Sequence, residues 1–500
     1  MELSILLAIP FAAGLLGLFA GKVGSRLLAL LGSFGALGFA IALALNADTS
    51  GGVAQFSTDT MWIAPLGVHW ALALDGLNEA LVLLTAFVYA SVVLACVTKR
   101  QDRTEQFYFH LAFATSGVLG ALLAQDLIVF VLFFDLMLVP FYFLVGQWGT
   151  GERIKATTKM MLYTLAGSLL MFAAAVAAGA IAAAEHGTHI DFLISNLRGL
   201  EMSHTSQHWI FVCFALAFLV KMPAVPLHGW LKDAYKAMPL PALALFSGVL
   251  SKVAAYGFLK IALPLFPDGA ADFHTYGLIL ALASILYGSA LAFTTSDARL
   301  VIAYSSIAQL GFITLGIFSL TGDGAQGAVL QMVNHGLVTV ILVGVVGVLS
   351  ARAKGSEDLG SMGGIAVGAP VLAVIFLIAG FANLAMPASA NFIGEFLILR
   401  GTWSSASVFA AIACIGVVMA AVYMLRMYIK AMHGPDTNGV EQRELNLREA
   451  LPLIPATLVV LALALYPQIV LDSSSHDVRM ALYPAAGDAN IQVDAPESQK

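Results

Sequence analysis

The 500-residue sequence contains few charged residues. Lys and Arg number 24, Asp and Glu number 30, and together they make up 11% of the chain, whereas 60% of the residues are hydrophobic. The mean hydropathy is +0.89. A soluble protein usually carries roughly 25% charged residues, so the composition excludes an ordinary soluble domain. The formal net charge of −6 gives no indication of nucleic-acid binding.

The sequence also has few cysteines and lacks nucleotide-binding motifs. Cys96, Cys213 and Cys414 each lie in a separate apolar run. Their spacing matches neither an iron–sulfur site nor a zinc site, and it indicates no disulfide framework. No glycine fingerprint of a dinucleotide-binding fold is present. We therefore expect this chain to hold no metal and no redox cofactor of its own.

Long apolar runs dominate what remains. A helix needs roughly 20 apolar residues to cross a bilayer, and the sequence predicts about fourteen such helices in an all-α, multi-pass membrane protein. The first run begins at Leu3 without a preceding basic segment, so we expect it to be retained rather than cleaved. The approximate limits are 3–21, 25–45, 76–98, 107–124, 126–148, 159–184, 208–231, 239–265, 274–295, 299–320, 325–350, 365–402, 406–431 and 451–471.

The basic residues alternate between the loops of this arrangement. Even-numbered loops contain only Arg198, Lys260 and Arg400, and the C-terminal tail adds Arg479 and Lys500. Because cytoplasmic loops are enriched in Lys and Arg, we expect the odd-numbered loops to face the cytoplasm and both termini to face outside. The odd-numbered loops and their flanks contain Lys22, Arg26, Lys99, Arg100, Arg103, Arg153, Lys155, Lys159, Lys232, Lys236, Arg299, Arg352, Lys354, Arg426, Lys430, Arg443 and Arg448.

Three longer segments lie outside the predicted spans. Residues 46–75 contain an alternating stretch around Val68 to Leu74 that indicates a short β-hairpin. Residues 185–207 contain His186, His189 and His204, but their spacing matches no metal-binding pattern. Residues 472–500 are polar, and we expect them to form a poorly ordered tail.

Four charged residues lie inside the predicted spans. They are Asp135, Lys221, Lys252 and Glu395. A charge at bilayer depth costs a few kcal/mol or more, so it persists where it has a function or a partner. The alternatives are a structural pair with a neighbouring helix for Asp135 and Lys252, a snorkelling side chain for Lys221, and a helix-start carboxylate for Glu395. Four such residues in one chain favour ion translocation over a passive structural subunit.

Prolines lie beside two of these charges. Pro223 and Pro226 follow Lys221, and Pro387 precedes Glu395. Proline removes an amide donor and breaks a helix. Broken helices are tolerated in a membrane where they line a cavity or pack inside protein, and they form ion sites in transporters. We expect the seventh and twelfth spans to be broken at these prolines.

Two histidines are further candidates. His335 lies within the span 325–350. Because the unperturbed pKa of histidine is near neutrality, His335 is either a proton relay or a hydrogen-bonded structural residue. His228 follows the proline break and is positioned to feed or cap the site.

The four charges suggest a mechanism. A nearby carboxylate keeps a buried lysine protonated, and its withdrawal favours release of the proton. We therefore interpret Asp135 and Lys221 as a one-proton switch, and our hypothesis is that Lys252 passes the proton to Glu395 for release outward.

Three segments carry a family resemblance. They are VKMPAVPLHGWLKDAYKAMP at 220–239, MVNHGL at 332–337 and ANFIGEF at 390–396. They resemble the antiporter-like membrane subunits of bacterial respiratory complex I, the proton-translocating NADH:quinone oxidoreductase, and the third resembles its subunit M family in particular. The resemblance covers roughly residues 60–470. It implies functional roles for Lys221, Lys252, His335 and Glu395, and the acid at the last position is diagnostic because related subunits usually have lysine there.

The sequence departs from this family pattern at two positions. Asp135 replaces the usual glutamate, which shortens the reach of the carboxylate by one methylene and suggests a weaker or water-mediated ion pair. Gln309, in AQLGF, replaces a histidine. A glutamine can hold a water chain but takes up no proton near neutral pH, so we expect no histidine relay there.

The resemblance also implies a domain arrangement. Helices 1–3 occupy residues 1–106, and two inverted five-helix repeats follow, at 107–265 (helices 4–8) and 274–431 (helices 9–13). Helix 14 and the polar tail occupy residues 451–500.

The resemblance finally implies partners. NADH, FMN, the iron–sulfur clusters and quinone would bind to partner subunits, and this chain would contact membrane lipid and neighbouring membrane-arm subunits in the bacterial inner membrane. The alternative is a subunit of a multi-subunit sodium/proton antiporter or a membrane-bound hydrogenase.

Overall fold

The computed structural model describes residues 1–49, 51–97, 101–187, 189–199, 202–435, 439–489 and 491. Lys99, Arg100 and Lys500 of the orientation pattern, and the side chain of His186, lie outside this set.

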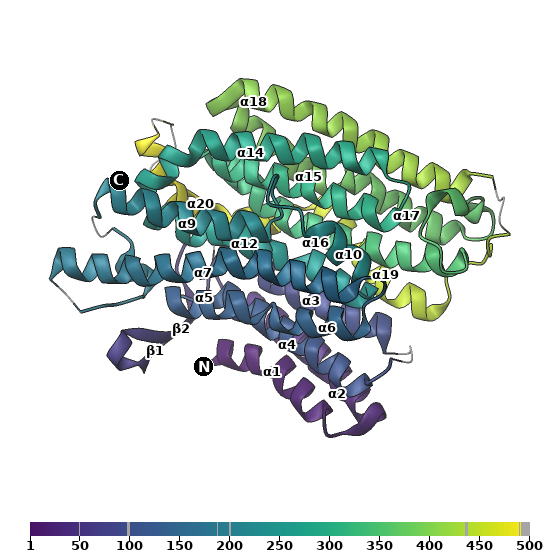
Figure 1. Cartoon of the computed structure of the whole chain (residues 1–500), viewed down its shortest axis with the longest axis horizontal. Helices are drawn as coiled ribbons and strands as arrows, with labels where there is room; N and C mark the ends of the chain where they lie inside the picture. Colours follow the sequence, from purple (N-terminus) through teal and green to yellow (C-terminus); the bar gives the residue numbers. More distant parts are fainter. Residues whose placement is uncertain are drawn as a thin grey trace.

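Long helices run side by side through the molecule (Figure 1). The helices are α1 (Glu2–Gly17), α2 (Gly21–Asn46), α3 (Glu79–Cys96), α4 (Thr104–Leu123), α5 (Leu127–Leu136), α6 (Val139–Trp148), α7 (Arg153–His186), α8 (Ile194–Leu197), α9 (His204–Lys221), α10 (Leu231–Ala237), α11 (Leu240–Leu245), α12 (Ser251–Gly257), α13 (Leu263–Leu265), α14 (Pro267–Thr294), α15 (Ala298–Phe318), α16 (Gly322–Arg352), α17 (Pro370–Asn383), α18 (Ala390–Tyr428), α19 (Leu447–Leu465) and α20 (Gln468–Asp488). Wider π-helical turns form η2 (Phe246–Leu250), η3 (Phe258–Ala262) and η6 (Ile429–His433), and single 3-10 turns form η1 (Ala64–Leu66), η4 (Leu359–Ser361) and η5 (Ile365–Val367).

The helices have the length and composition of membrane spans. Within the described residues, eleven helical segments are long and apolar enough to cross a bilayer, and α1 and α17 are shorter apolar helices. The predicted all-α membrane fold is therefore confirmed, while the count of fourteen spans stays a prediction. The boundary predicted between the twelfth and thirteenth spans, at 402–406, coincides with Ala406, whose non-helical backbone kinks α18.

Both predicted helix breaks are present. α9 ends at Lys221, and the chain is non-helical until α10 begins at Leu231. α17 ends at Asn383, and α18 begins at Ala390. The prolines explain both breaks, because each removes an amide that would continue the helical hydrogen-bond pattern.

The hairpin prediction is confirmed, whereas the predicted tail is mostly helical. Strands β1 (Gln55–Ile63) and β2 (Val68–Leu74) pair antiparallel. The expectation of a poorly ordered tail is wrong for residues 472–488, which belong to α20. Their average polarity hid an apolar stripe at helical spacing, which is typical of an amphipathic helix packed on a core. The stripe consists of Val478, Ala481, Leu482 and Ala485, all buried.

Ion pairs join four of the odd-numbered loops at one end of the bundle, called the odd-loop end below. Lys159 contacts Asp233 at 2.8 Å, which joins loop 5–6 to loop 7–8. Lys236 contacts Asp297 and Glu357, which joins loop 7–8 to loops 9–10 and 11–12.

The opposite end, called the hairpin end, contains β1, β2 and the N-terminus, which donates to Thr58. Lys260 of η3 pairs there with Asp75 at 2.6 Å, and the Gly76 amide donates to Asp477 of α20 at 2.7 Å.

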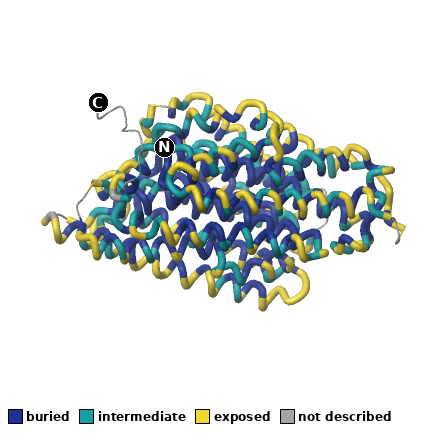
Figure 2. Tube along the Cα trace, turned by 90° about the horizontal axis from the view of Figure 1, so that it is seen from above, coloured by how far each residue is buried: buried dark blue, intermediate teal, exposed yellow. Residues whose placement is uncertain are grey.

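The most buried helices form the centre of the molecule. The segment Leu240–Leu265 and helix α15 are fully buried over their most apolar windows, whereas α2, α18 and α19 expose much of theirs. Buried residues accordingly fill the middle of the bundle, and exposed ones lie at its margins (Figure 2). The candidate charges therefore lie in or against a protein core.

Candidate functional site

Lys221 is the last residue of α9, and its side chain is 1% exposed. Its ammonium donates to the Phe134 carbonyl and lies 3.3 Å from the centre of the Phe134 ring. That carbonyl is available because the Leu138 amide donates to the Asp135 carbonyl instead. Pro140 lacks an amide hydrogen, and α5 ends nearby, at Leu136. The break between α5 and α6 thus creates a binding place for the buried ammonium.

Asp135 follows Phe134 but forms no direct ion pair with Lys221 among the described residues. Its carboxylate is close enough to act on the ammonium electrostatically. The oxygen Oδ1 is buried and has no hydrogen-bond partner within the described part of the chain. A carboxylate oxygen in this position can accept a hydrogen bond from a water molecule. The structure thus brings the two predicted residues near each other without joining them.

Lys252 lies in α12, directly after the wide turn η2, and is 1% exposed. Its ammonium donates to the carbonyl of Ser247 within that turn. A π-helical turn leaves carbonyls without their usual helical partner, so η2 supplies the acceptor that a buried lysine needs.

His335 of α16 lies beside Lys252. The histidine is 1% exposed and is close enough for Lys252 to act on it electrostatically. Neither ring nitrogen has a hydrogen-bond partner in the described set. The approach of α16 to η2 requires glycine, because a Cβ on Gly336 would lie 2.6 Å from the Gly248 carbonyl oxygen.

Glu395 lies on α18, shortly after the second break, and is 3% exposed. Gln331 of α16 donates to its Oε1 at 3.3 Å and to the side-chain oxygen of Gln309 at 2.6 Å. Gln309 in turn donates to the Asn383 carbonyl at 3.0 Å. Gln309 is the glutamine that departs from the resembled family, and it lies in the same hydrogen-bonded group as the carboxylate.

Sequence reasoning overlooked several buried amides and one tyrosine around Glu395. Asn334 donates to the Ala390 carbonyl at 2.7 Å. A signal was available, because a buried amide costs free energy unless it is hydrogen-bonded and is therefore informative within an apolar run. The overlooked residues are Gln331, Asn334, Asn383, Asn391 and Tyr423, all buried.

His228 forms no hydrogen bond with these groups in the described part of the chain. It is half-buried in the non-helical segment between α9 and α10, and its ring lies 5.3 Å from the ring of Tyr287 on α14. The structure thus places His228 beside a tyrosine, at the side of the break toward the odd-loop end.

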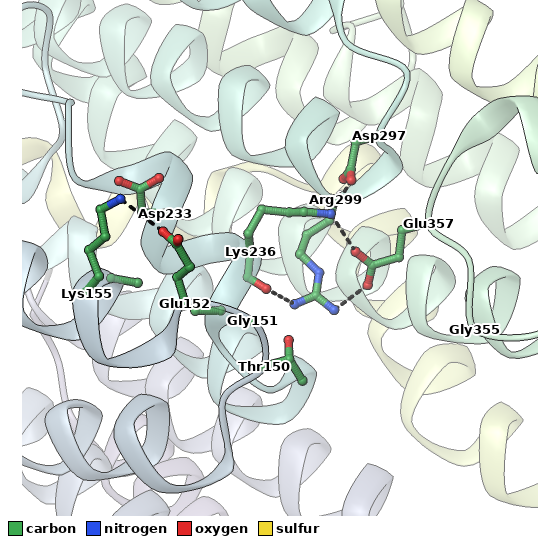
Figure 3. A pocket seen from close by; sticks show the side chains of 12 residues that line it. Thr150, Gly151, Glu152, Lys155, Asp233, Lys236, Asp297, Arg299, Gly355 and Glu357 are labelled. Carbon is green, nitrogen blue, oxygen red and sulfur yellow. Dashed lines mark hydrogen bonds and ion pairs between the residues drawn. The ribbon is translucent and has the colours of Figure 1, made fainter.

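A cavity of about 620 Å³ opens at the odd-loop end and is lined by charged side chains (Figure 3). Arg299 is central to it. Its guanidinium donates to the carbonyls of Tyr235, Lys236 and Met238 and pairs with Glu357. Arg299 lies at the start of α15 and therefore connects it to α10, the helix that follows the break after Lys221, and to the loop after α16. The sequence indicated only that Arg299 is one of the basic residues of the odd-numbered loops.

The predicted residues form three buried groups on neighbouring helices. These are Asp135 with Lys221, Lys252 with His335, and Glu395 with its amides. Each group contains a side chain that can exchange a proton. Lys221 lies at the break after α9, Glu395 lies shortly after the break that follows α17, and Lys252 and His335 lie in the buried centre. No set of three His, Cys, Asp or Glu side chains in the described residues is arranged to hold a metal ion.

Comparison with known proteins places this geometry in context. The family described as "NADH:quinone oxidoreductase/Mrp antiporter, TM" matches residues 124–421. NADH-quinone oxidoreductase subunit M from Escherichia coli strain K12 is 35% identical, over 95% of this chain and 96% of that protein. The subunit M from Pseudomonas aeruginosa is 36% identical, over 83% and 82% respectively.

Two solved structures are also similar. A chain of respiratory complex I from Thermus thermophilus with bound NADH superposes with a TM-score of 0.87 at 29% identity, covering 98% of this chain and 99% of that one. A chain of the Mrp complex from Dietzia sp. superposes with a TM-score of 0.82 at 23% identity, covering 98% and 97%. The second likeness concerns the fold alone.

Proposed function

Because the chain belongs to the family of NADH-quinone oxidoreductase subunit M, we propose that its three buried groups carry protons across the membrane within that complex. The chain is a multi-pass membrane subunit of a proton-translocating oxidoreductase. It works among other membrane-arm subunits, and NADH, FMN, the iron–sulfur clusters and quinone belong to its partners.

The observation that carries the proposal is the burial of Lys221, Lys252 and Glu395, which are 1%, 1% and 3% exposed. Charged side chains in a bilayer are expensive and serve mainly ion pathways. Both lysines point to backbone carbonyls rather than to carboxylates. A carbonyl stabilises the ammonium by a hydrogen bond but carries no full negative charge. A change in the charge nearby can therefore change whether the lysine is protonated.

Each group has a distinct role in the transfer. Asp135 biases Lys221 through its charge. His335 receives the proton from Lys252, since its two ring nitrogens offer one donor and one acceptor when neutral. Glu395 accepts the proton last and releases it outward. Gln331 holds the carboxylate in place, because an amide donates a hydrogen bond without taking up a proton. His228 connects the Lys221 break to the odd-loop end.

We further propose the orientation and repeat structure. The odd-loop end, where Lys159, Lys236 and Arg299 meet, faces the cytoplasm, since basic loops are retained there. Both termini then face the outer side of a bacterial inner membrane. Residues 107–265 and 274–431 form inverted repeats of five helices each, and the similar breaks after α9 and α17 support this division. Residues 1–106 add three helices, and residues 451–500 contain the last span and α20.

The test is proton pumping by the assembled complex with Lys221→Ala. We expect quinone reduction and assembly to survive while pumping into sealed vesicles is lost. Lys430→Ala is the matched control, because Lys430 is exposed at the end of the second repeat. Normal pumping by the Lys221 variant would contradict the proposal.

A further inference from the structure

A second cavity lies away from the proton-transfer groups. It measures about 300 Å³ and is bounded by α3, α11, α16 and the start of α19. Its walls are largely apolar and include Val92, Leu240, Val343 and Leu453. None of the proposed proton-transfer residues lines it. Its volume is at the lower end of the usual range for ligand pockets.

The cavity extends along α16 from Val340 to Ala351. These residues are eleven positions apart, which corresponds to roughly 16 Å along a helix. The hydrocarbon core of a bilayer is about 30 Å thick, so the cavity is about one leaflet deep. Val340 is buried, Gly344 and Gly347 are half-buried, and Ala351 is exposed. The cavity therefore ends near mid-membrane and opens toward the odd-loop end.

Its mouth carries a positive charge, on Arg448, that has no ion-pair partner within the described residues. Glu449 accepts hydrogen bonds from both terminal nitrogens of Arg352, at 3.1 and 2.7 Å, and from the amide of Asn446 at 3.0 Å. Its charge is therefore matched within the protein. The adjacent Arg448 is exposed, and its guanidinium forms no hydrogen bond or ion pair with the described residues.

We propose that this cavity binds one acyl chain of an anionic phospholipid, whose phosphate contacts Arg448. Apolar walls over the depth of a leaflet suit a hydrocarbon chain, because burial of apolar surface is favourable. A guanidinium binds phosphate oxygens in a bidentate manner. A neutral isoprenoid ligand would leave the charge of Arg448 unused, so the mouth favours a lipid with a phosphate.

The floor of the cavity links this site to the proton-transfer groups. Val340 packs against η2, since a Cβ on Gly248 would lie 2.8 Å from its Cγ2. The neighbouring Ser247 carbonyl is the acceptor for Lys252. A bound acyl chain would therefore stiffen the contact between α16 and η2 that positions Lys252.

The test uses the assembled complex in phosphatidylcholine nanodiscs that contain a trace of phosphatidylglycerol with a diazirine at the end of one acyl chain. After photolysis, labelled peptides are identified by mass spectrometry. We expect labels on the parts of α3 and α16 that line the cavity. Arg448→Ala should lower this labelling roughly fivefold, since one basic residue near an anionic membrane surface contributes about that factor. Ala95→Leu, which fills the wall on α3, should also lower it.

Arg443→Ala is the matched control, because Arg443 lies in the same segment, pairs with Glu441 and does not line the cavity. Its labelling should equal that of the unmodified complex. Equal labelling by a diazirine phosphatidylcholine, labelling unchanged by Arg448→Ala, or labels found only on neighbouring subunits would each overturn the proposal.

Discussion

The ammonium of Lys221 lies 3.3 Å from the centre of the Phe134 ring and donates to the Phe134 carbonyl. The lysine therefore binds to the residue before Asp135 rather than to the carboxylate itself. A shorter acid in place of the family's glutamate fits this arrangement, because the ammonium has a backbone acceptor of its own. The carboxylate acts on it through space.

This geometry predicts a partial effect for Asp135→Asn. The ammonium keeps its carbonyl acceptor but loses a nearby negative charge, an effect of about 1 kcal/mol for partly screened charges, or roughly fivefold. We expect pumping to fall by that factor and assembly to remain normal. The measurement is the initial rate of vesicle acidification at a fixed rate of quinone reduction. Asp472→Asn, at an exposed site of α20, should change nothing. Complete loss of pumping would instead indicate a direct ion pair.

Gln331→Leu should impair transfer at Glu395. The substitution removes the donor to the carboxylate and leaves the side-chain oxygen of Gln309 unpaired. An unsatisfied buried polar group costs about 1–3 kcal/mol, so we expect a pumping rate at least several-fold lower with electron transfer retained. Gln326→Leu, on the same helix but near α20, serves as the control. Equal pumping rates for the two variants would contradict the role given to Gln331.

Arg299→Ala should destabilise the subunit strongly. It would remove the guanidinium partner of Glu357, which keeps only its contact with Lys236, and the donor to the carbonyls of Tyr235, Lys236 and Met238. The removal of one partner from a buried pair costs about 3–5 kcal/mol. Arg400→Ala should cost about 0–1 kcal/mol, since its pair with Asp323 is exposed. Thermal unfolding of the detergent-solubilised complex, followed by size-exclusion fluorescence, measures the difference. Similar unfolding midpoints for both variants would show that the contacts of Arg299 with these carbonyls and with Glu357 contribute little to stability.

The attachment of α20 should depend on pH. Burial and the neighbouring Asp75 raise the pKa of Asp477 above its usual value. An acid whose pKa is raised in the folded state stabilises it below the unfolded pKa, about 3.9, and loses that contribution as pH rises through the folded value. Hydrogen exchange of α20 should therefore slow as pH falls from neutral to mildly acidic, after correction for the intrinsic rate. Asp477→Asn keeps an acceptor for the Gly76 amide, and we expect it to remove the pH dependence of exchange in α20. If the pH dependence persists in this variant, another group causes it.

Several features of the site could be predicted because they depend on local composition. Lys221, Lys252, His335 and Glu395 lie in apolar runs, and the structure buries all four. The prolines predicted both helix breaks, since a missing amide acts within a single turn. The alternating stretch near Val68 predicted the hairpin for the same local reason.

Other features depended on which helices meet. Gln331 and Gln309 are unremarkable alone, and they become part of the site only where α15, α16 and α18 bring their amides to Glu395. The hydrogen bonds of Arg299 join it to Met238 and Glu357, each about 60 positions away in the chain. α20 was misjudged because its polar average concealed an apolar face whose partner was unknown.

The amino-acid sequence by itself determined that this protein spans a membrane, where two of its helices break, and which charged side chains lie in the apolar segments. These properties follow from hydropathy and from missing amides, which act over a few residues. Only the tertiary structure decided what each charge contacts. The partner of a buried ammonium is whichever acceptor the packing of distant helices leaves free, and for Lys221 that acceptor is a carbonyl exposed by a break in another helix.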